Sequence, residues 1–311
     1  MSGEHRFSDL LLKRVAEAVL SATVASGPAI RRMRGRCLVL AYHNVLPPGA
    51  TAVGDRSLHL PWSQFMAQMD LLARHVHVVP LARLLASGNA DDERPQVVIT
   101  FDDAYVGAVH HALPELVRRG MPATVFVAPA LLDGEAFWWD RLADAATGAV
   151  REEQREYALQ PLAGRDAMVM AWAAQQGLSV SDPAAHSRGA PVEALDHAAT
   201  LPGMTFGAHT WSHPNVAQLS GAELEQELAR PLAWIERFGN RALQALAYPY
   251  GLFGDKAEQV ARGLGYRLTF RVDGGWMERG AQVAEPLPRW NVSAGISADG
   301  FRLRLAGVLA R

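Results

Sequence analysis

The stretch Val97-Val98-Ile99-Thr100-Phe101-Asp102-Asp103 decides the fold class of this chain. Its first five residues are apolar or β-branched, which is typical of a buried strand, and two carboxylates follow where that strand ends. Comparable runs recur along the chain, each followed by a longer stretch with helical spacing. We expect strands at residues 37–42, 77–79, 97–101, 123–127, 205–208, 243–247, 267–270 and 288–292. Such an alternation predicts an α/β barrel built on a parallel sheet.

The length and composition are those of a globular chain. It has 311 residues, of which 49% are hydrophobic and 20% charged, so it can bury a large core as one barrel with an insertion or as two domains. A net charge of −2 argues against a nucleic-acid partner. No run of about 20 apolar residues predicts a transmembrane helix. Cys37 is the only cysteine, which excludes an intramolecular disulfide.

Residues 1–35 form a region distinct from the barrel, which we assign to residues 36–311. Apolar residues recur there every four positions and predict an amphipathic helix, namely Phe7, Leu11, Val15 and Val19. A basic linker follows, with Arg31, Arg32, Arg34 and Arg36. The helix either packs on the barrel or holds the protein peripherally at the inner membrane surface, where anionic lipids attract basic residues. Because Lys13, Arg14 and Glu17 interrupt the apolar run, we expect a cytoplasmic location rather than secretion.

The segment 134–202 is longer than a crossover helix needs, so we expect an inserted helical subdomain between two barrel strands. Trp138 and Trp139 stand at its start, close to the end of the preceding strand. Their rings are candidates for stacking on a sugar, and the alternative is that they form the core of the subdomain. Beyond the insertion, Ser220 and Glu223 predict a capping box at the start of a helix.

Polar residues of unusual type follow three of the expected strands. Asp102 and Asp103 follow one strand, His209 and His213 follow another, and Tyr248-Pro249-Tyr250-Gly251 follows a third. Each motif alone is compatible with an ordinary turn, cap or solvated pair. Together they lie where barrels place active sites, at the carboxyl ends of the strands. One carboxylate and two imidazoles make a three-ligand metal site with an open position, and the second carboxylate stays available as a base.

The sequence resembles the polysaccharide deacetylases with a NodB homology domain, carbohydrate esterase family 4. Both of the family's first two motifs are present in full, T-F-D-D at residues 100–103 and H-T-W-S-H at residues 209–213. The resemblance implies a distorted (β/α)7 barrel that removes acetyl groups from N-acetylated sugars with the help of a divalent metal. It implies that Asp102 is the general base and that Asp103, His209 and His213 hold the metal. Zn²⁺ suits these ligands, and Co²⁺, Ni²⁺ or Fe²⁺ also fit them.

The third motif agrees with the family only in part. The resemblance implies that the backbone N–H of Tyr250 stabilises the oxyanion. However, Ala247 stands where many members carry an arginine that orients the base, and no histidine follows His213 to act as a late general acid. The orienting cation and the acid must therefore come from other parts of the chain.

The run Leu40-Ala41-Tyr42-His43-Asn44-Val45 offers the missing acid. It is similar to the Y-H-x-V motif of a subgroup with a circularly permuted barrel, which implies that His43 is the general acid; a structural histidine is the alternative. Arg289, in the last expected strand, looks like the late arginine of such relatives and would orient Asp102. The alternative is a surface arginine on an edge strand.

These observations lead to one functional expectation. We expect a metal-dependent de-N-acetylase that acts on an N-acetyl amino sugar in a cell-surface polysaccharide or in its precursor, which includes a lipid-linked glycolipid. An O-acetyl esterase and a non-catalytic carbohydrate-binding barrel are the alternatives. Trp211, inside the second motif, joins Trp138 and Trp139 as a candidate contact to the glycan.

Overall fold

A computed structural model describes residues 16–21, 27–85, 94–279 and 286–308 of the chain. Its main sheet follows the strands expected from the sequence closely. The strands are β1 (Arg36–Tyr42), β2 (Asn44–Val45), β3 (His59–Leu60), β4 (His77–Val78), β5 (Gln96–Phe101), β6 (Ala123–Val127), β7 (Met204–Ala208), β8 (Ala242–Ala247), β9 (Leu268–Arg271), β10 (Met277–Glu278), β11 (Leu287–Pro288) and β12 (Trp290–Asn291).

The sheet closes into a distorted barrel, as the sequence predicts. Neighbouring strands follow the order β1-β5-β6-β7-β8-β9-β11, and each of these pairs is parallel. The expected strand 288–292 is split into β11, which pairs with β9, and β12, which pairs with β1. One short segment therefore joins the last strand to the first. Arg289 is the residue between its two halves, and its backbone N–H donates to Arg271 O at 3.0 Å.

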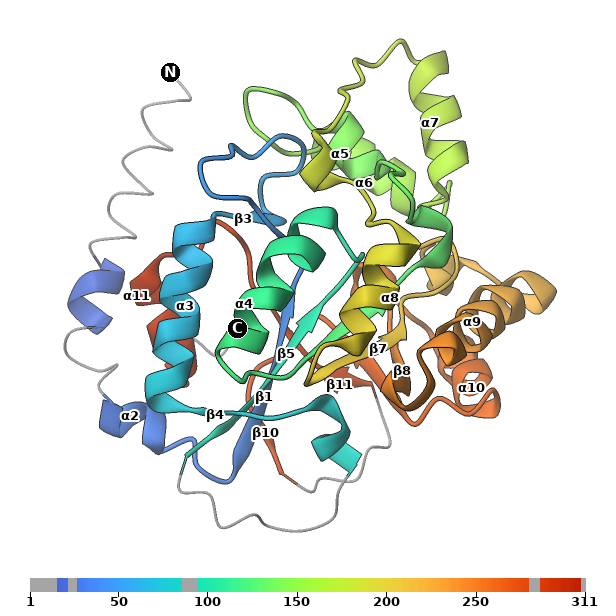
Figure 1. Cartoon of the computed structure of the whole chain (residues 1–311). Helices are drawn as coiled ribbons and strands as arrows, with labels where there is room; N and C mark the ends of the chain where they lie inside the picture. The colour runs from blue at the N-terminus through green and yellow to red at the C-terminus, as the bar shows by residue number, and fades with distance from the viewer. Residues whose placement is uncertain (1–15, 22–26, 86–93, 280–285, 309–311) are drawn as a thin grey trace.

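Helices surround this sheet (Figure 1). Their bounds are α2 (Gly27–Arg31), α3 (Trp62–His75), α4 (Leu113–Arg118), α5 (Trp138–Leu142), α6 (Glu152–Leu159), α7 (Asp166–Gln175), α8 (Val192–Thr200), α9 (Gly221–Ile235), α10 (Asp255–Gly263) and α11 (Ala298–Leu305). The largest core cluster lies between the helices and the sheet. A smaller core cluster includes Val39, Val98, Phe126 and Phe270. Along a strand, residues of this cluster alternate with residues of the largest cluster, because successive side chains of a strand point to opposite faces of the sheet.

The expected insertion occupies the connection between β6 and β7. Helices α5, α6 and α7 stand together beyond one end of the barrel (Figure 1). Helix α8, in contrast, packs against β7 as a barrel helix does. The insertion therefore consists of α5 to α7, and the return helix α8 belongs to the barrel wall.

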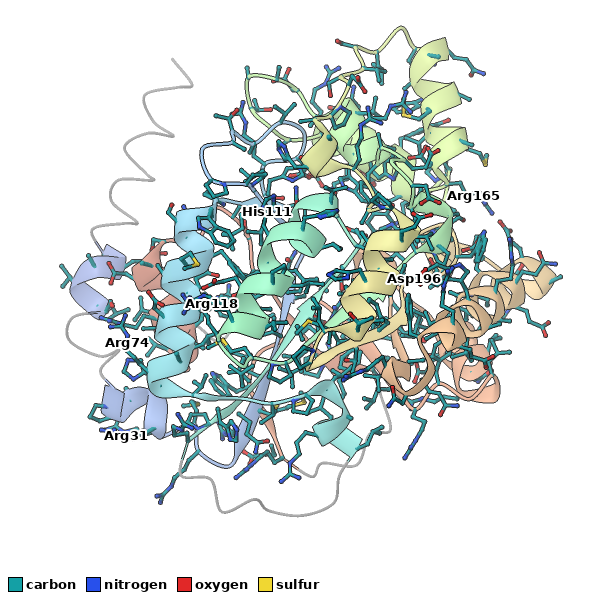
Figure 2. All side chains as sticks on the ribbon, in the orientation of Figure 1. Arg31, Arg74, His111, Arg118, Arg165 and Asp196 are labelled. Carbon is teal, nitrogen blue, oxygen red and sulfur yellow. The ribbon has the colours of Figure 1, made fainter. Side chains whose placement is uncertain are left out.

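The predicted capping box is wrong. Ser220 is the residue before α9, but its side chain makes no capping hydrogen bond. Glu223 instead accepts a hydrogen bond from Arg165 Nε at 2.8 Å, which joins α9 to the insertion. Figure 2 shows Arg165 at the surface near α7. A tertiary ion pair has replaced the local contact that the sequence pattern favoured.

The N-terminal region is described only in part. Phe7, Leu11 and Val15 lie outside the described residues. Residues 16–21 are helical, and Glu17 accepts a hydrogen bond from Ser297 Oγ at 2.6 Å, just before α11. Arg31, at the end of α2, is exposed at the lower left of the molecule (Figure 2). Within the described residues, no helix has the length and apolar character needed to cross a membrane.

Candidate active site and metal centre

A pocket opens at the carboxyl ends of the barrel strands. Its lining combines the ends of β1, β5, β7 and β8 with residues of the insertion. The residues that line it are His43, Leu58, Asp102, Asp103, Trp139, Arg155, His209, His213, Tyr248, Tyr250, Val272 and Asn291. Seven of the site residues expected from the sequence thus share one cavity, as the barrel argument predicts.

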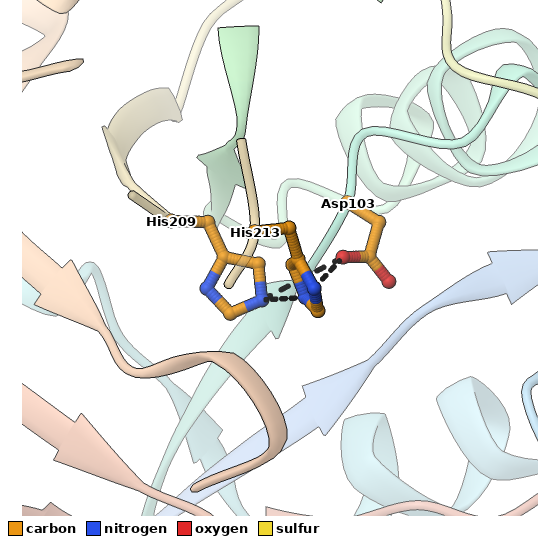
Figure 3. Close-up of side chains that lie close together, drawn as sticks. All are labelled: Asp103, His209 and His213. Carbon is orange, nitrogen blue, oxygen red and sulfur yellow. Dashed lines mark hydrogen bonds and ion pairs between the residues drawn. The ribbon is translucent and has the colours of Figure 1, made fainter. Parts of the chain in front are cut away.

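Asp103, His209 and His213 converge on one point (Figure 3). His213 Nε2 lies 3.1 Å from His209 Nε2, and Asp103 Oδ1 lies 3.1 Å from His213 Nε2 and 3.6 Å from His209 Nε2. Tetrahedral zinc with bonds of about 2.0–2.1 Å requires ligand atoms about 3.3–3.4 Å apart. The spacing of the three atoms therefore fits a tetrahedral divalent cation with its fourth position open.

The protonation states of the cluster also fit a cation. His209 Nδ1 lies 2.7 Å from Ala247 O, so this nitrogen donates its proton to the carbonyl and leaves the Nε2 lone pair facing Asp103 and His213. Burial lowers the pKa of His209 to about 4, so the ring is neutral at pH 7. Lone pairs of two imidazoles and a carboxylate repel one another at these distances unless a proton or a cation lies between them. The three ligand atoms suit a divalent cation.

The backbone around the cluster takes an unusual conformation. Asp103, Thr210, His213 and Tyr250 have φ between 59° and 67°, a region that residues other than glycine adopt rarely. Such conformations persist only where the surroundings enforce them. At the second motif, Glu227 of α9 supplies that support. Its carboxylate accepts hydrogen bonds from Trp211 N at 3.0 Å and Ser212 N at 2.9 Å.

Arg289 is the cation that orients Asp102. The guanidinium makes two parallel hydrogen bonds to the carboxylate, Nη1 to Oδ1 and Nη2 to Oδ2, each 2.7 Å long. Arg289 is fully buried, so the alternative of a surface arginine is excluded. Burial alone would raise the pKa of Asp102, but the charge and hydrogen bonds of Arg289 outweigh burial and hold that pKa well below its usual value. Asp102 is therefore ionised at neutral pH.

His43 follows β1 and lines the same pocket as Asp102 and Asp103. Its Nδ1 atom is buried and has no hydrogen-bond partner among the described residues. The next residue, Asn44, is held by His59, whose Nδ1 accepts from Asn44 Nδ2 at 3.0 Å. The structure therefore brings His43 into the same pocket as Asp102, and its role as a general acid stays a prediction.

The three tryptophans proposed for sugar binding occupy different environments. Trp139 lines the pocket, and its ring centroid lies 4.8 Å from that of His213. Trp138 is buried and donates from Nε1 to the Tyr250 hydroxyl at 2.9 Å. Trp211 lies beneath Arg230, with the guanidinium carbon 3.7 Å from the ring centroid. Contact with a sugar stays a prediction, and Trp139 alone of the three lines the pocket.

A buried polar network beside the pocket has no counterpart in the sequence analysis. Asp140 of α5 is fully buried and accepts hydrogen bonds from His59 Nε2 and the Tyr105 hydroxyl, each at 2.9 Å. Trp139 Nε1 donates to the same Tyr105 oxygen at 2.8 Å. The network ties the first turn of the insertion to the barrel and fixes the ring that covers His213. In the sequence, this network is indicated only by the position of Asp140 directly after Trp139.

Comparisons with known proteins find similarity to polysaccharide deacetylases. Residues 185–269 match the family model described as polysaccharide deacetylase. The chain is 21% identical over 266 residues to YxkH of Bacillus subtilis strain 168, whose name assigns it to the polysaccharide deacetylases; the match covers 85% of this chain and 74% of that protein.

Solved structures share the fold. The Streptococcus pyogenes deacetylase PplD, in complex with acetate, superposes with a TM-score of 0.57 at 16% identity, and the match covers 87% of this chain and 98% of that chain. IcaB from Ammonifex degensii superposes with a TM-score of 0.56 at 19% identity, and the match covers 88% of this chain and 96% of that chain.

The barrel is shared with solved deacetylase structures, and the Asp-His-His cluster offers three ligand atoms that could hold a metal ion. The chain is therefore similar to the polysaccharide deacetylase family over residues 185–269 and, at 21% identity, to a named polysaccharide deacetylase over 85% of its length.

Proposed function

We propose that the protein is a divalent-metal-dependent hydrolase that removes the acetyl group from an N-acetyl amino sugar of a cell-surface polysaccharide or its lipid-linked precursor. One observation carries the proposal: the convergent atoms of Asp103, His209 and His213 share a pocket with the oriented carboxylate of Asp102. Zinc is the proposed metal because two imidazoles and one carboxylate suit it.

When bound, the metal polarises the acetyl carbonyl and makes water more acidic. Asp102 accepts a proton from the attacking water, since its carboxylate is ionised and fixed in plane by Arg289. The backbone N–H of Tyr250 donates to the oxygen on which negative charge develops. His43, which follows β1 next to the strand that precedes Asp102, gives a proton to the departing amine nitrogen. The products are acetate and the free amino sugar.

Acetate release tests the proposal. The purified protein is incubated with N-acetylated chitooligosaccharides and, separately, with synthetic O-acetyl esters, before and after dialysis against a chelator. We expect acetate from the oligosaccharides, loss after dialysis and recovery with added Zn²⁺, with Co²⁺, Ni²⁺ and Fe²⁺ as comparisons. Release from the esters alone would make the protein an O-acetyl esterase. No release from either, with carbohydrate binding intact, would make it a binding barrel.

A further inference from the structure

The insertion places an arginine at the catalytic pocket. Arg155, Ala158 and Leu159 share one face of α6, because residues three and four apart are neighbours on a helix. Ala158 and Leu159 are buried, so this face turns toward the barrel. Arg155 itself lines the pocket that contains the metal cluster and Tyr250. Among the pocket-lining residues of the described chain, it is the only lysine or arginine.

Helix α6 is anchored to the metal-binding loop. Asn215, two residues after His213, donates from Nδ2 to Leu159 O at 2.9 Å, and its backbone N–H donates to Ala163 O at 2.7 Å. Gly164 N donates to Ala158 O at 2.7 Å and closes the end of the helix. The backbone that carries Arg155 is therefore fixed relative to Asn215 and the loop after His213, so a ligand has only the side chain to order.

The guanidinium of Arg155 keeps its donors available. Within the described residues, its side chain makes one ion pair, with Asp55 Oδ2 at 3.8 Å, which is too long for a hydrogen bond. The other oxygen of Asp55 is occupied by Ser57, whose hydroxyl lies 2.6 Å away. The Arg155 side chain is 38% exposed, so water, rather than protein, solvates much of it. This arrangement holds the arginine near the pocket without using up its hydrogen bonds.

A planar guanidinium with several N–H donors matches the paired oxygens of a carboxylate or a phosphate. The same lining includes the apolar side chains Leu58 and Val272 and the Trp139 ring, and it offers an anion no other lysine or arginine. We propose that Arg155 is a specificity-determining residue that binds an anionic substituent on the deacetylated sugar or on the unit next to it. This inference rests on the proposed function, and it adds that the preferred substrate is negatively charged.

The test compares charged and neutral substrates of equal length. The probes are diacetylchitobiose, its 1-phosphate, and a disaccharide of a uronic acid and N-acetylglucosamine; the last two separate phosphate from carboxylate. We expect wild type to prefer a charged probe, and Arg155→Gln to reduce the charged-to-neutral ratio of kcat/KM by roughly 10- to 100-fold, as for a lost hydrogen bond to a charged group. Arg155→Lys should recover part of the ratio.

Arg151→Gln is the matched control, because Arg151 is exposed, precedes α6 directly and does not line the pocket. It removes the same charge and should leave the ratio unchanged. A ratio that Arg155→Gln does not change, or that Arg151→Gln lowers equally, overturns the inference while the proposed function stands. If no probe releases acetate, the proposed function fails, and calorimetric binding of the same probes to wild type and Arg155→Gln decides the inference by the same comparison.

Discussion

Replacement of Arg289 by methionine removes a cation from the interior of the barrel while keeping a side chain of comparable length. Arg289 is fully buried, and Asp102 is 2% exposed. Their two hydrogen bonds of 2.7 Å bring both partners into one plane. The guanidinium carbon also lies 5.2 Å from the centroid of the Phe126 ring. The variant therefore leaves the Asp102 carboxylate without its principal counter-charge in a site that water reaches poorly.

The expected loss of stability at pH 7 is about 3–5 kcal/mol, which is typical when one partner of a buried ion pair is removed. The exposed pair of Arg36 and Glu278, with side chains 45% and 69% accessible, provides the comparison. Arg36→Met should cost less than about 1 kcal/mol, because water screens that pair. A double variant, Arg289→Met with Asp102→Asn, should recover much of the loss since it removes the unpaired charge as well.

The pH dependence has a definite sign. The pKa of Asp102 is depressed in the folded protein, so its contribution to stability is present above the ordinary aspartate pKa of about 3.9 and is lost as the pH falls toward the folded value. Without Arg289 the folded pKa rises, because burial then acts with less opposition. In the variant, Asp102 can therefore become protonated as the pH falls. The difference in the free energy of unfolding between wild type and the variant should then shrink in acid.

Urea denaturation of wild type, Arg289→Met, Arg36→Met and the double variant between about pH 4 and 7.5 measures these differences. The pH profile of kcat/KM for acetate release should move its acidic limb to higher pH in Arg289→Met. A deficit that is below about 1 kcal/mol at pH 7, or that does not change with pH, would refute the account of Arg289 as the counter-charge of Asp102.

Three further results are expected. His209→Ala or His213→Ala should lower bound zinc and acetate release together, whereas Asp102→Asn should keep the metal and lose activity; full metal content in both histidine variants, measured by atomic absorption, would contradict the ligand assignment. His43→Ala should reduce turnover by roughly 10²- to 10⁴-fold with the fold intact by circular dichroism, as for a lost general acid, and an unchanged rate would exclude that role. The full chain should sediment with anionic vesicles, and a version starting at Gly35 should not. Each basic residue near the surface contributes about 1 kcal/mol of binding free energy, so added salt should weaken the sedimentation. Equal sedimentation of the two versions would exclude a membrane role for residues 1–34.

Much of the barrel and all three residues of the Asp-His-His cluster could be predicted from the sequence, because strands and short motifs are local patterns. Apolar runs such as 123–127 coincide with strands, and Asp103, His209 and His213 lie close to strand ends. Strand ends of a parallel barrel meet at one face, so neighbouring motifs are brought together without knowledge of the details. The subgroup with a permuted barrel stays a prediction.

Contacts between distant segments could not be predicted in the same way. The capping box at Ser220 failed because Glu223 finds Arg165, 58 positions away. Asp140 is hydrogen-bonded to His59, which lies 81 positions earlier in the chain, and no local periodicity encodes that pairing. The position of Arg155 over the pocket likewise depends on how α6 docks on the loop after His213.

The split closing segment links catalysis to the order in which the chain is synthesised. Asp102 leaves the ribosome 187 residues before its partner Arg289, and β12 joins β1 only after nearly all of the barrel has been translated. Long-range pairings of this kind form late, because closing the long loop between the partners costs entropy before their contacts add any stability. A nascent chain that already carries Asp103, His209 and His213 would thus hold the Asp102 carboxylate without its orienting arginine until the closing segment docks.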